Sequence, residues 1–210
     1  MRLAILSETS AADRNADILR ALEPHGYELL NCGMRRSGEA PELSYLHTGL
    51  MAALLLGLGR VDFVIGGCGT GQGFLNAALL YPGVSCGHVL CPLDAWLFAR
   101  INGGNCVSLA LNQGYGWAGD VNLRLVFEQL FTPERGAGYP EHRSMPQRAS
   151  RELLGRLSNL THRPMAELVS ALPDEVALPA LRYPGFLEAA LTGRPKDEAL
   201  AAAMAARAEA

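Results

Sequence analysis

The sequence has no concentration of basic residues and almost no net charge. Its 210 residues include 18 Lys and Arg against 21 Asp and Glu, which gives a formal charge of −3 at pH 7. A protein that holds nucleic acid through its phosphates needs a dense basic surface. We therefore expect no nucleic-acid partner.

Long apolar segments are also missing. The longest run, residues 50–58, is much shorter than the roughly 20 residues of a membrane-spanning helix and is typical of a buried helix. At the start of the chain, Arg2 is followed by only four apolar residues before Ser7, which does not fit a signal peptide. The sequence predicts a soluble protein with no membrane partner.

The cysteines form no CxxC pair, and their odd number does not fit a disulfide framework. They are Cys32, Cys68, Cys86, Cys91 and Cys106. Cys86 and Cys91 fall on one predicted strand and its exit, which is poor geometry for zinc, so we expect no metal. Reduced thiols imply a cytoplasmic location, and most of these side chains are expected to be small apolar core residues.

Short apolar runs alternate with helical segments up to about residue 132. Strands are predicted over residues 3–6, 27–32, 61–65, 84–90 and 106–111, and helices over 12–25, 43–56, 74–80, 93–101 and 118–131. This alternation is typical of a parallel sheet with helices on both faces. We predict an α/β fold, a three-layer α/β/α sandwich with a five-stranded parallel Rossmann-like sheet.

The composition changes at Thr132, where a stretch rich in Pro, Gly and Arg begins. We predict one α/β domain over residues 1–132, followed by an arm and a C-terminal helical extension over 133–210. Helical patterns cover 151–160, 165–172 and the Glu- and Ala-rich tail. The extension is expected to pack on the same or a partner subunit, although an exposed or frayed tail helix is equally compatible with the pattern.

In open α/β sheets, ligands bind at the carboxyl ends of the strands, where the winding reverses. The loops expected there are residues 7–14, 33–37, 66–73, 91–94 and 112–117. The third of them, GGCGTGQG, places Cys68 among glycines between a predicted strand and a predicted helix. Glycines let backbone N–H groups approach a ligand, and a helix N-terminus favours an anion, a developing oxyanion or a thiolate.

Three interpretations of this loop compete. A nucleotide site is disfavoured because the loop has no lysine, has the wrong glycine spacing and falls in the third β/α unit. A simple tight turn does not need so many glycines around Cys68 and Thr70. The third interpretation is cysteine chemistry, either covalent or as a general base.

Covalent cysteine catalysis requires an activating histidine. The five histidines are His25, His47, His88, His142 and His162, and no neighbouring residues mark any of them. A general base is simpler, because it needs only a thiolate next to the substrate C–H and donors for the enediolate oxygen. Thr70 and the loop amides supply such donors.

The strand–GCGTG-x-G–helix segment, residues 82–84 (PGV), Ala95 and residues 102–105 (NGGN) together resemble the ribose-5-phosphate isomerase type B / galactose-6-phosphate isomerase (RpiB/LacAB) family. The resemblance covers about the first two-thirds of the chain. It implies a homodimer with sites at the subunit interface. It also implies aldose–ketose isomerisation through a cis-enediol with no metal and no cofactor.

The resemblance assigns roles to individual residues. Cys68 falls on the proton-transferring cysteine and Asn102 on the substrate-binding asparagine of the family. Gly69, Thr70, Gly71 and Gly73 fall on the loop whose amides hold the substrate oxygens. Arg143 and Arg148 lie in the region of the phosphate-gripping arginines.

Several positions depart from the family pattern. The first strand ends in Ser7-Glu8 in place of Asp-His, and the ring-opening histidine is replaced by Ile101. An Asn-Lys pair is replaced by Leu79-Leu80, and an arginine by Ser85. These changes favour a substrate that is already open-chain and whose anionic group differs in kind or position from that of the usual sugar phosphates.

We therefore expect an aldose–ketose isomerase that acts on a sugar phosphate or a related open-chain acidic sugar. Ser7, Glu8 and Asn102 are expected to bind hydroxyls, with Glu8 a candidate second acid/base. One alternative is an isomerase of 4-deoxy-5-hexosulose uronate, and another is a non-catalytic sugar-binding subunit. The partners expected are a small-molecule sugar and further copies of the chain, as a homodimer or homotetramer.

Overall fold

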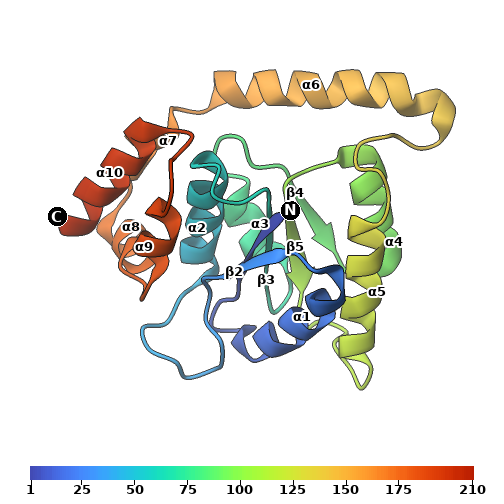
Figure 1. Cartoon of the computed structure of the whole chain (residues 1–210), viewed down its shortest axis with the longest axis horizontal. Coiled ribbons are helices and arrows are strands. Elements are labelled where there is room, and N and C mark those ends of the chain that lie inside the picture. Colours follow the sequence, from blue (N-terminus) through green and yellow to red (C-terminus); the bar gives the residue numbers. More distant parts are fainter.

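The computed structural model describes residues 1–210, and its centre is a five-stranded sheet (Figure 1). The strands are β1 (Arg2–Leu6), β2 (Glu28–Asn31), β3 (Phe63–Cys68), β4 (Cys86–Val89) and β5 (Cys106–Ala110). All pairs are parallel, in the order β2-β1-β3-β5-β4. The predicted fold class is confirmed.

Ten α-helices accompany the sheet. They are α1 (Asn15–Leu22), α2 (Tyr45–Gly57), α3 (Gln72–Ala78), α4 (Pro92–Leu97), α5 (Gly119–Phe131), α6 (Ser144–Thr161), α7 (Met165–Ala171), α8 (Asp174–Leu181), α9 (Phe186–Leu191) and α10 (Glu198–Glu209). The predicted first helix is broken into α1 and two short 3-10 turns, and the predicted fourth ends in a π-helical turn, Phe98–Asn102.

The two faces of the sheet have separate cores because successive strand side chains point to opposite sides. Leu3 and Ile5 of β1 face one core, with α1, α4 and α5. Ala4 and Leu6 face the other, with α2 and α3. The C-terminal helices α7 to α10 contribute side chains to this second core, so they pack on the same chain.

Strand β3 is longer than predicted. It continues through Cys68, so Gly66 and Gly67 belong to the strand and not to a turn. A Cβ on Gly66 would lie 2.0 Å from the Phe74 ring, and one on Gly67 would lie 2.4 Å from the Leu109 carbonyl oxygen. These two glycines therefore permit close packing, which the sequence pattern did not distinguish from loop flexibility.

Helix α6 is unlike the other helices because none of its residues is buried. It crosses the end of the molecule where the strands begin and links α5 to the C-terminal helices (Figure 1). It begins at Ser144, seven residues before the predicted start at residue 151. No helix in the chain combines the length and hydropathy of a transmembrane span.

Candidate active site

The glycine loop lies where the winding of the sheet reverses. β1 and β3 are neighbours. The helices that follow them, α1 and α3, contribute to the cores on opposite faces of the sheet. Cys68 is the last residue of β3, and Ser7 directly follows β1. The carboxyl ends of two such strands form the crevice in which open α/β sheets bind ligands.

Contacts between loops hold the segment after Cys68 in place. The Gly69 N–H donates to Ser10 Oγ at 2.8 Å, and the Asn112 side-chain amide donates to the Ser10 carbonyl at 2.6 Å. The Gly69 carbonyl accepts from the N–H groups of Asn112 and Gln113. The loops that follow β1, β3 and β5 are thus bound to one another around Cys68.

The loop amides divide into two groups. Those of Gly69 and Gly71 already have acceptors, which are Ser10 Oγ and the Cys68 carbonyl. Those of Thr70, Gly73 and Phe74 have no acceptor within the chain. A developing oxyanion at this loop would therefore meet the amides of this second group, only two of which belong to residues singled out from the sequence.

Cys68 is itself largely enclosed, with 6% of its surface exposed, whereas Thr70 is exposed. Their Sγ and Oγ1 atoms are 4.0 Å apart, at the outer limit of a sulfur hydrogen bond. The Thr70 hydroxyl also accepts from the Gln72 N–H at 3.3 Å. The thiol and the hydroxyl therefore lie together at the start of α3.

His88 and Ser108 form hydrogen bonds with backbone carbonyls of the loop, and the sequence analysis did not assign either of them to the site. Ser108 is completely buried and its hydroxyl donates to the Gly71 carbonyl at 2.5 Å. His88 Nε2 is 3.0 Å from the Thr70 carbonyl, so that nitrogen carries the proton, since a carbonyl can only accept. A Cβ on Gly71 would lie 2.6 Å from this nitrogen, and the φ of Gly71 is 76°.

These two residues are brought under the loop by strand order. They are register partners on β4 and β5. His88 lies one residue before the end of its strand, and this position is its only signal in the sequence. That signal becomes informative only when β5 is known to lie between β3 and β4.

The residues at the end of β1 are buried. Ser7 is 1% exposed and its hydroxyl accepts from Asn15 Nδ2 at 3.2 Å. Glu8 is 2% exposed, and its carboxylate accepts from both the N–H and the hydroxyl of Ser10. Glu8 forms no ion pair. Its carboxylate is linked to the crevice by the hydroxyl of Ser10, which is exposed.

The remaining predicted site residues lie at the opposite edge of the sheet. Asn102 precedes β5, and Cys68 pairs with Ala110 at the far end of that strand. β5 alone spans about 13 Å. Arg143 and Arg148 are exposed at the start of α6, which packs on the π-helical turn containing Asn102. Within one chain, Asn102, Arg143 and Arg148 therefore do not join Cys68.

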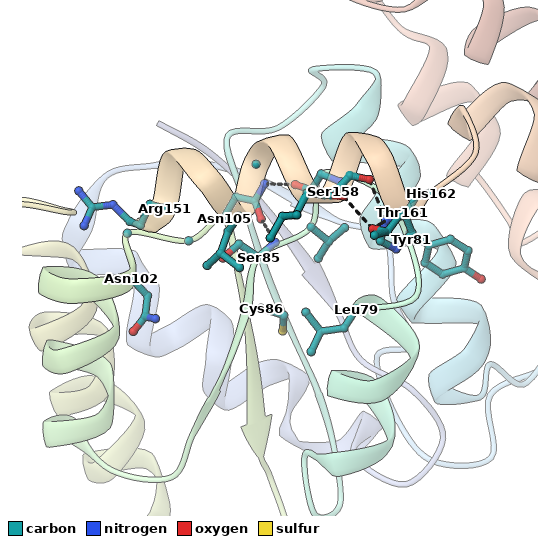
Figure 2. Close-up of a pocket in the computed structure, with 17 residues that line it drawn as sticks. Leu79, Tyr81, Ser85, Cys86, Asn102, Asn105, Arg151, Ser158, Thr161 and His162 are labelled. Atoms are coloured by element: carbon teal, nitrogen blue, oxygen red, sulfur yellow. Dashed lines mark hydrogen bonds between the residues drawn. The ribbon is translucent and has the colours of Figure 1, made fainter. Parts of the chain in front are cut away.

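A cavity of about 580 Å³ lies at that opposite edge, beneath α6. Figure 2 shows Asn102 and Arg151 at one end of it and His162 at the other. Arg151 donates to the carbonyls of Ile101 and Gly136, so it ties α6 to the turn before β5. This cavity is remote from the glycine loop and does not contain Cys68.

No group of three or more His, Cys, Asp or Glu side chains is arranged to hold a metal ion. The groups that surround Cys68 are a hydroxyl, unpaired amides and a buried carboxylate linked to a serine. Such a set can move protons and stabilise an oxyanion.

The sequence model of ribose/galactose isomerases matches residues 3–121, more than half of the chain. This chain belongs to the ribose/galactose isomerase family. The family consists of sugar isomerases, so the RpiB/LacAB resemblance is confirmed. A comparison with curated protein sequences finds no match.

Two solved structures resemble this isomerase over its whole length. A 4-deoxy-L-threo-5-hexosulose-uronate ketol-isomerase, complexed with tartrate, is 32% identical, with 100% of each chain covered and a TM-score of 0.93. A ribose-5-phosphate isomerase from Vibrio parahaemolyticus is 37% identical, with 99% of each chain covered and the same TM-score.

A ribose-5-phosphate isomerase from Thermotoga maritima is more distant. It is 23% identical, with a TM-score of 0.57 over 70% of this chain and 96% of that chain. At this identity the likeness shows the fold alone. This chain shares its C-terminal extension with the two structures that match it from end to end.

Proposed function

We propose that this isomerase interconverts an aldose and a ketose of an open-chain acidic sugar through a cis-enediolate, with Cys68 as the proton-transferring base. The observation that carries the proposal is the position of Cys68 at the end of β3, beside Thr70 and amides that have no acceptor within the chain.

The chemistry follows from these groups. The Cys68 thiolate takes the proton from the carbon next to the carbonyl, and the electron pair of that C–H bond moves onto the carbonyl oxygen. The amides of Thr70 and Gly73, together with the Thr70 hydroxyl, donate to the enediolate oxygen. The thiol then returns the proton to the neighbouring carbon, while Ser10, backed by Glu8, exchanges the proton between the two oxygens. The cycle needs only acid–base groups.

Two features favour an open-chain uronate over a cyclic sugar phosphate. Ile101 has no titratable group and cannot open a ring. The uronate ketol-isomerase is similar to this chain from end to end, and its bound tartrate is a dicarboxylate. Because the ribose-5-phosphate isomerase is equally similar in structure, a linear sugar phosphate is the second candidate substrate.

We further propose that a complete site needs two copies of the chain. Asn102 and Cys68 lie at opposite edges of the sheet, so Asn102 of one chain serves the Cys68 crevice of another. Exposed leucines on α6 support association, since Leu153 and Leu160 are 47% and 80% exposed. A homodimer is the simplest assembly, and a homotetramer would pair two of them.

The five free thiols are consistent with a location in the cytoplasm.

The decisive experiment is proton exchange in deuterated water. The purified chain is incubated with 4-deoxy-5-hexosulose uronate, linear sugar phosphates and cyclic sugar phosphates. We expect deuterium next to the carbonyl of the uronate with wild-type protein and none with Cys68→Ala. If folded, reduced protein exchanges no compound, the isomerase proposal is wrong and a non-catalytic sugar-binding subunit becomes the better description.

The shared site has its own test, which uses two inactive variants. Cys68→Ala and Asn102→Ala are each expected to be inactive alone. After co-expression, random pairing gives half of the dimers one intact site of two, so about a quarter of wild-type activity returns. If the mixture stays inactive although mixed dimers form, Asn102 of one chain does not serve the Cys68 crevice of another, and the shared-site proposal is wrong.

A further inference from the structure

Arg14 is a cation at the carboxyl edge of the sheet that has no anionic partner. It lies directly before α1, in the loop that follows β1. The chain has five ion pairs, and none includes Arg14. Its side chain makes no hydrogen bond, and its buried Nε has no acceptor. By contrast, Arg100 and Arg207, whose Nε atoms are also buried and unpaired, each bind a carbonyl through another nitrogen.

The guanidinium is nevertheless held in one place. It stacks over the Tyr115 ring, with 4.1 Å between Arg14 Cζ and the ring centroid. The Tyr115 hydroxyl donates to Asp17 at 2.6 Å, which fixes the ring. Burial and this hydrogen bond raise the pKa of Tyr115 well above its usual value, so the ring stays neutral. A stacked guanidinium keeps the N–H groups at its edge free for an anion.

Nearby carboxylates are occupied elsewhere. Both oxygens of Asp13 accept from Ser37, and those of Asp17 accept from Tyr115 and Arg20. They therefore do not use the donors of Arg14. The pKa of Asp13 is lowered first by its hydrogen bonds from Ser37 and only to a smaller extent by the charge of Arg14. The N–H groups of Arg14 are available to an anion that comes from outside the chain.

Arg14 is connected to the Cys68 crevice on both sides. It lies four residues after Ser10, whose hydroxyl accepts from the Gly69 N–H. Its stacking partner Tyr115 follows Asn112, which binds both Ser10 and Gly69. The same loops that fix the reacting end of the crevice thus carry the guanidinium.

We propose that Arg14 binds the carboxylate or phosphate at the far end of the substrate and so selects acidic sugars. This inference rests on the proposed function and adds a residue that the family pattern did not assign. A guanidinium presents paired N–H donors that match either anion in a bidentate manner. It also explains how a substrate anion can be bound at the Cys68 edge of the same chain, where Arg143 and Arg148 do not lie.

The direct test is binding, which does not depend on turnover. Tartrate and inorganic phosphate are titrated calorimetrically into wild-type protein, Arg14→Gln, Arg14→Lys and Arg124→Gln. Arg124 is exposed on α5 without an ion pair, and it serves as the matched control. We expect Arg14→Gln to weaken binding of the preferred anion about 10- to 100-fold, as for a lost charged hydrogen-bond pair. We expect Arg14→Lys to restore part of it and Arg124→Gln to have no effect.

Equal binding by wild type and Arg14→Gln overturns the inference, and so does wild-type protein that binds neither anion. Circular dichroism confirms that the variants are folded. If Arg14→Gln is not folded, Arg14→Met, which keeps the apolar stem on Tyr115, takes its place. The preference between tartrate and phosphate identifies the anion.

Kinetics then separate this inference from the proposed function. For the acidic substrate we expect a raised KM with a nearly unchanged kcat in Arg14→Gln. An active wild type with the same KM in Arg14→Gln refutes only the role of Arg14. Wild-type protein that binds tartrate through Arg14 but isomerises nothing refutes the isomerase proposal and leaves the anion site standing.

Discussion

Cys68 is positioned by a strand and not by a mobile loop, and this matters for its chemistry. Its backbone carbonyl accepts from Leu111 and Gly71, and its amide belongs to the β3–β5 ladder. The backbone that carries the Cys68 sulfur is therefore fixed in position, while the nearby Thr70 is exposed and accessible to a substrate. Precise placement of the base relative to the substrate C–H is what a proton-transfer step requires.

Replacement of the thiol should abolish turnover without loss of the fold. We expect Cys68→Ser to lower kcat at least ~100-fold, because a serine hydroxyl is not ionised near neutral pH and cannot act as the base. Cys32→Ala, a comparably buried thiol at the end of β2, is the control and should keep its turnover. A Cys68→Ser enzyme with near-normal turnover would remove Cys68 from the mechanism.

A second thiol, that of Cys32, contributes to the loss of stability at high pH. Burial raises the pKa of Cys32 to about 11 from an ordinary value of 9.0. Between these values the unfolded chain loses the proton and the folded chain keeps it, so the free energy of unfolding falls as pH rises. The loss amounts to about 2–3 kcal/mol between pH 9 and 11. Urea unfolding should show this slope in wild type and a smaller one in Cys32→Ala; equal slopes would contradict the assignment.

At the scale of elements, the unit β3–α3 shows what the sequence could and could not predict. The alternation of apolar runs located all five strands and the helices around them, because buried strands and helices need apolar residues at regular spacing. It did not show that Gly66 and Gly67 lie inside β3, since the reason is close contact with Phe74 and Leu109, which only the folded chain brings against these glycines. His88, Ser108 and Arg14 were missed for the same reason, because strand order and loop contacts bring them to the site.

The glycines of this unit can be tested against a glycine elsewhere. Gly66→Ala should destabilise the protein by about 1–3 kcal/mol, because the methyl group would overlap the Phe74 ring. Gly155→Ala, in the middle of α6 with no atom within 4 Å of the added Cβ, should stabilise by about 0.5–1 kcal/mol. Denaturant unfolding measures both, and a Gly66→Ala protein as stable as wild type would show that α3 can move away.

At the scale of the whole molecule, the two edges of the sheet have different tasks. The carboxyl edge holds Cys68 and its donors, whereas the amino edge holds Asn102, the cavity and α6. A helix with no buried residue gains little from its own chain. Its stability must come from its sequence or from a neighbour, and the exposed apolar stripe that contains Leu153 and Leu160 favours the neighbour.

Association through α6 is open to a direct measurement. We expect Leu160→Glu to convert the assembly to folded monomers, because a charge on the exposed apolar stripe opposes burial but costs the isolated chain little. Leu125→Glu, on the exposed side of α5, is the control. Light scattering with size-exclusion chromatography reports the mass, and an unchanged mass for Leu160→Glu would place the interface elsewhere.

The way in which α6 joins two parts of one core has a consequence for a cleaved chain. Leu181, Phe186 and Leu200 share a buried cluster with side chains of α2, while α6 lies outside both cores. A protease that cuts within α6 would break the covalent connection but not this packing. The two fragments should then migrate separately on a denaturing gel and together on a native column, so the protein could be expressed as two pieces that assemble into one fold.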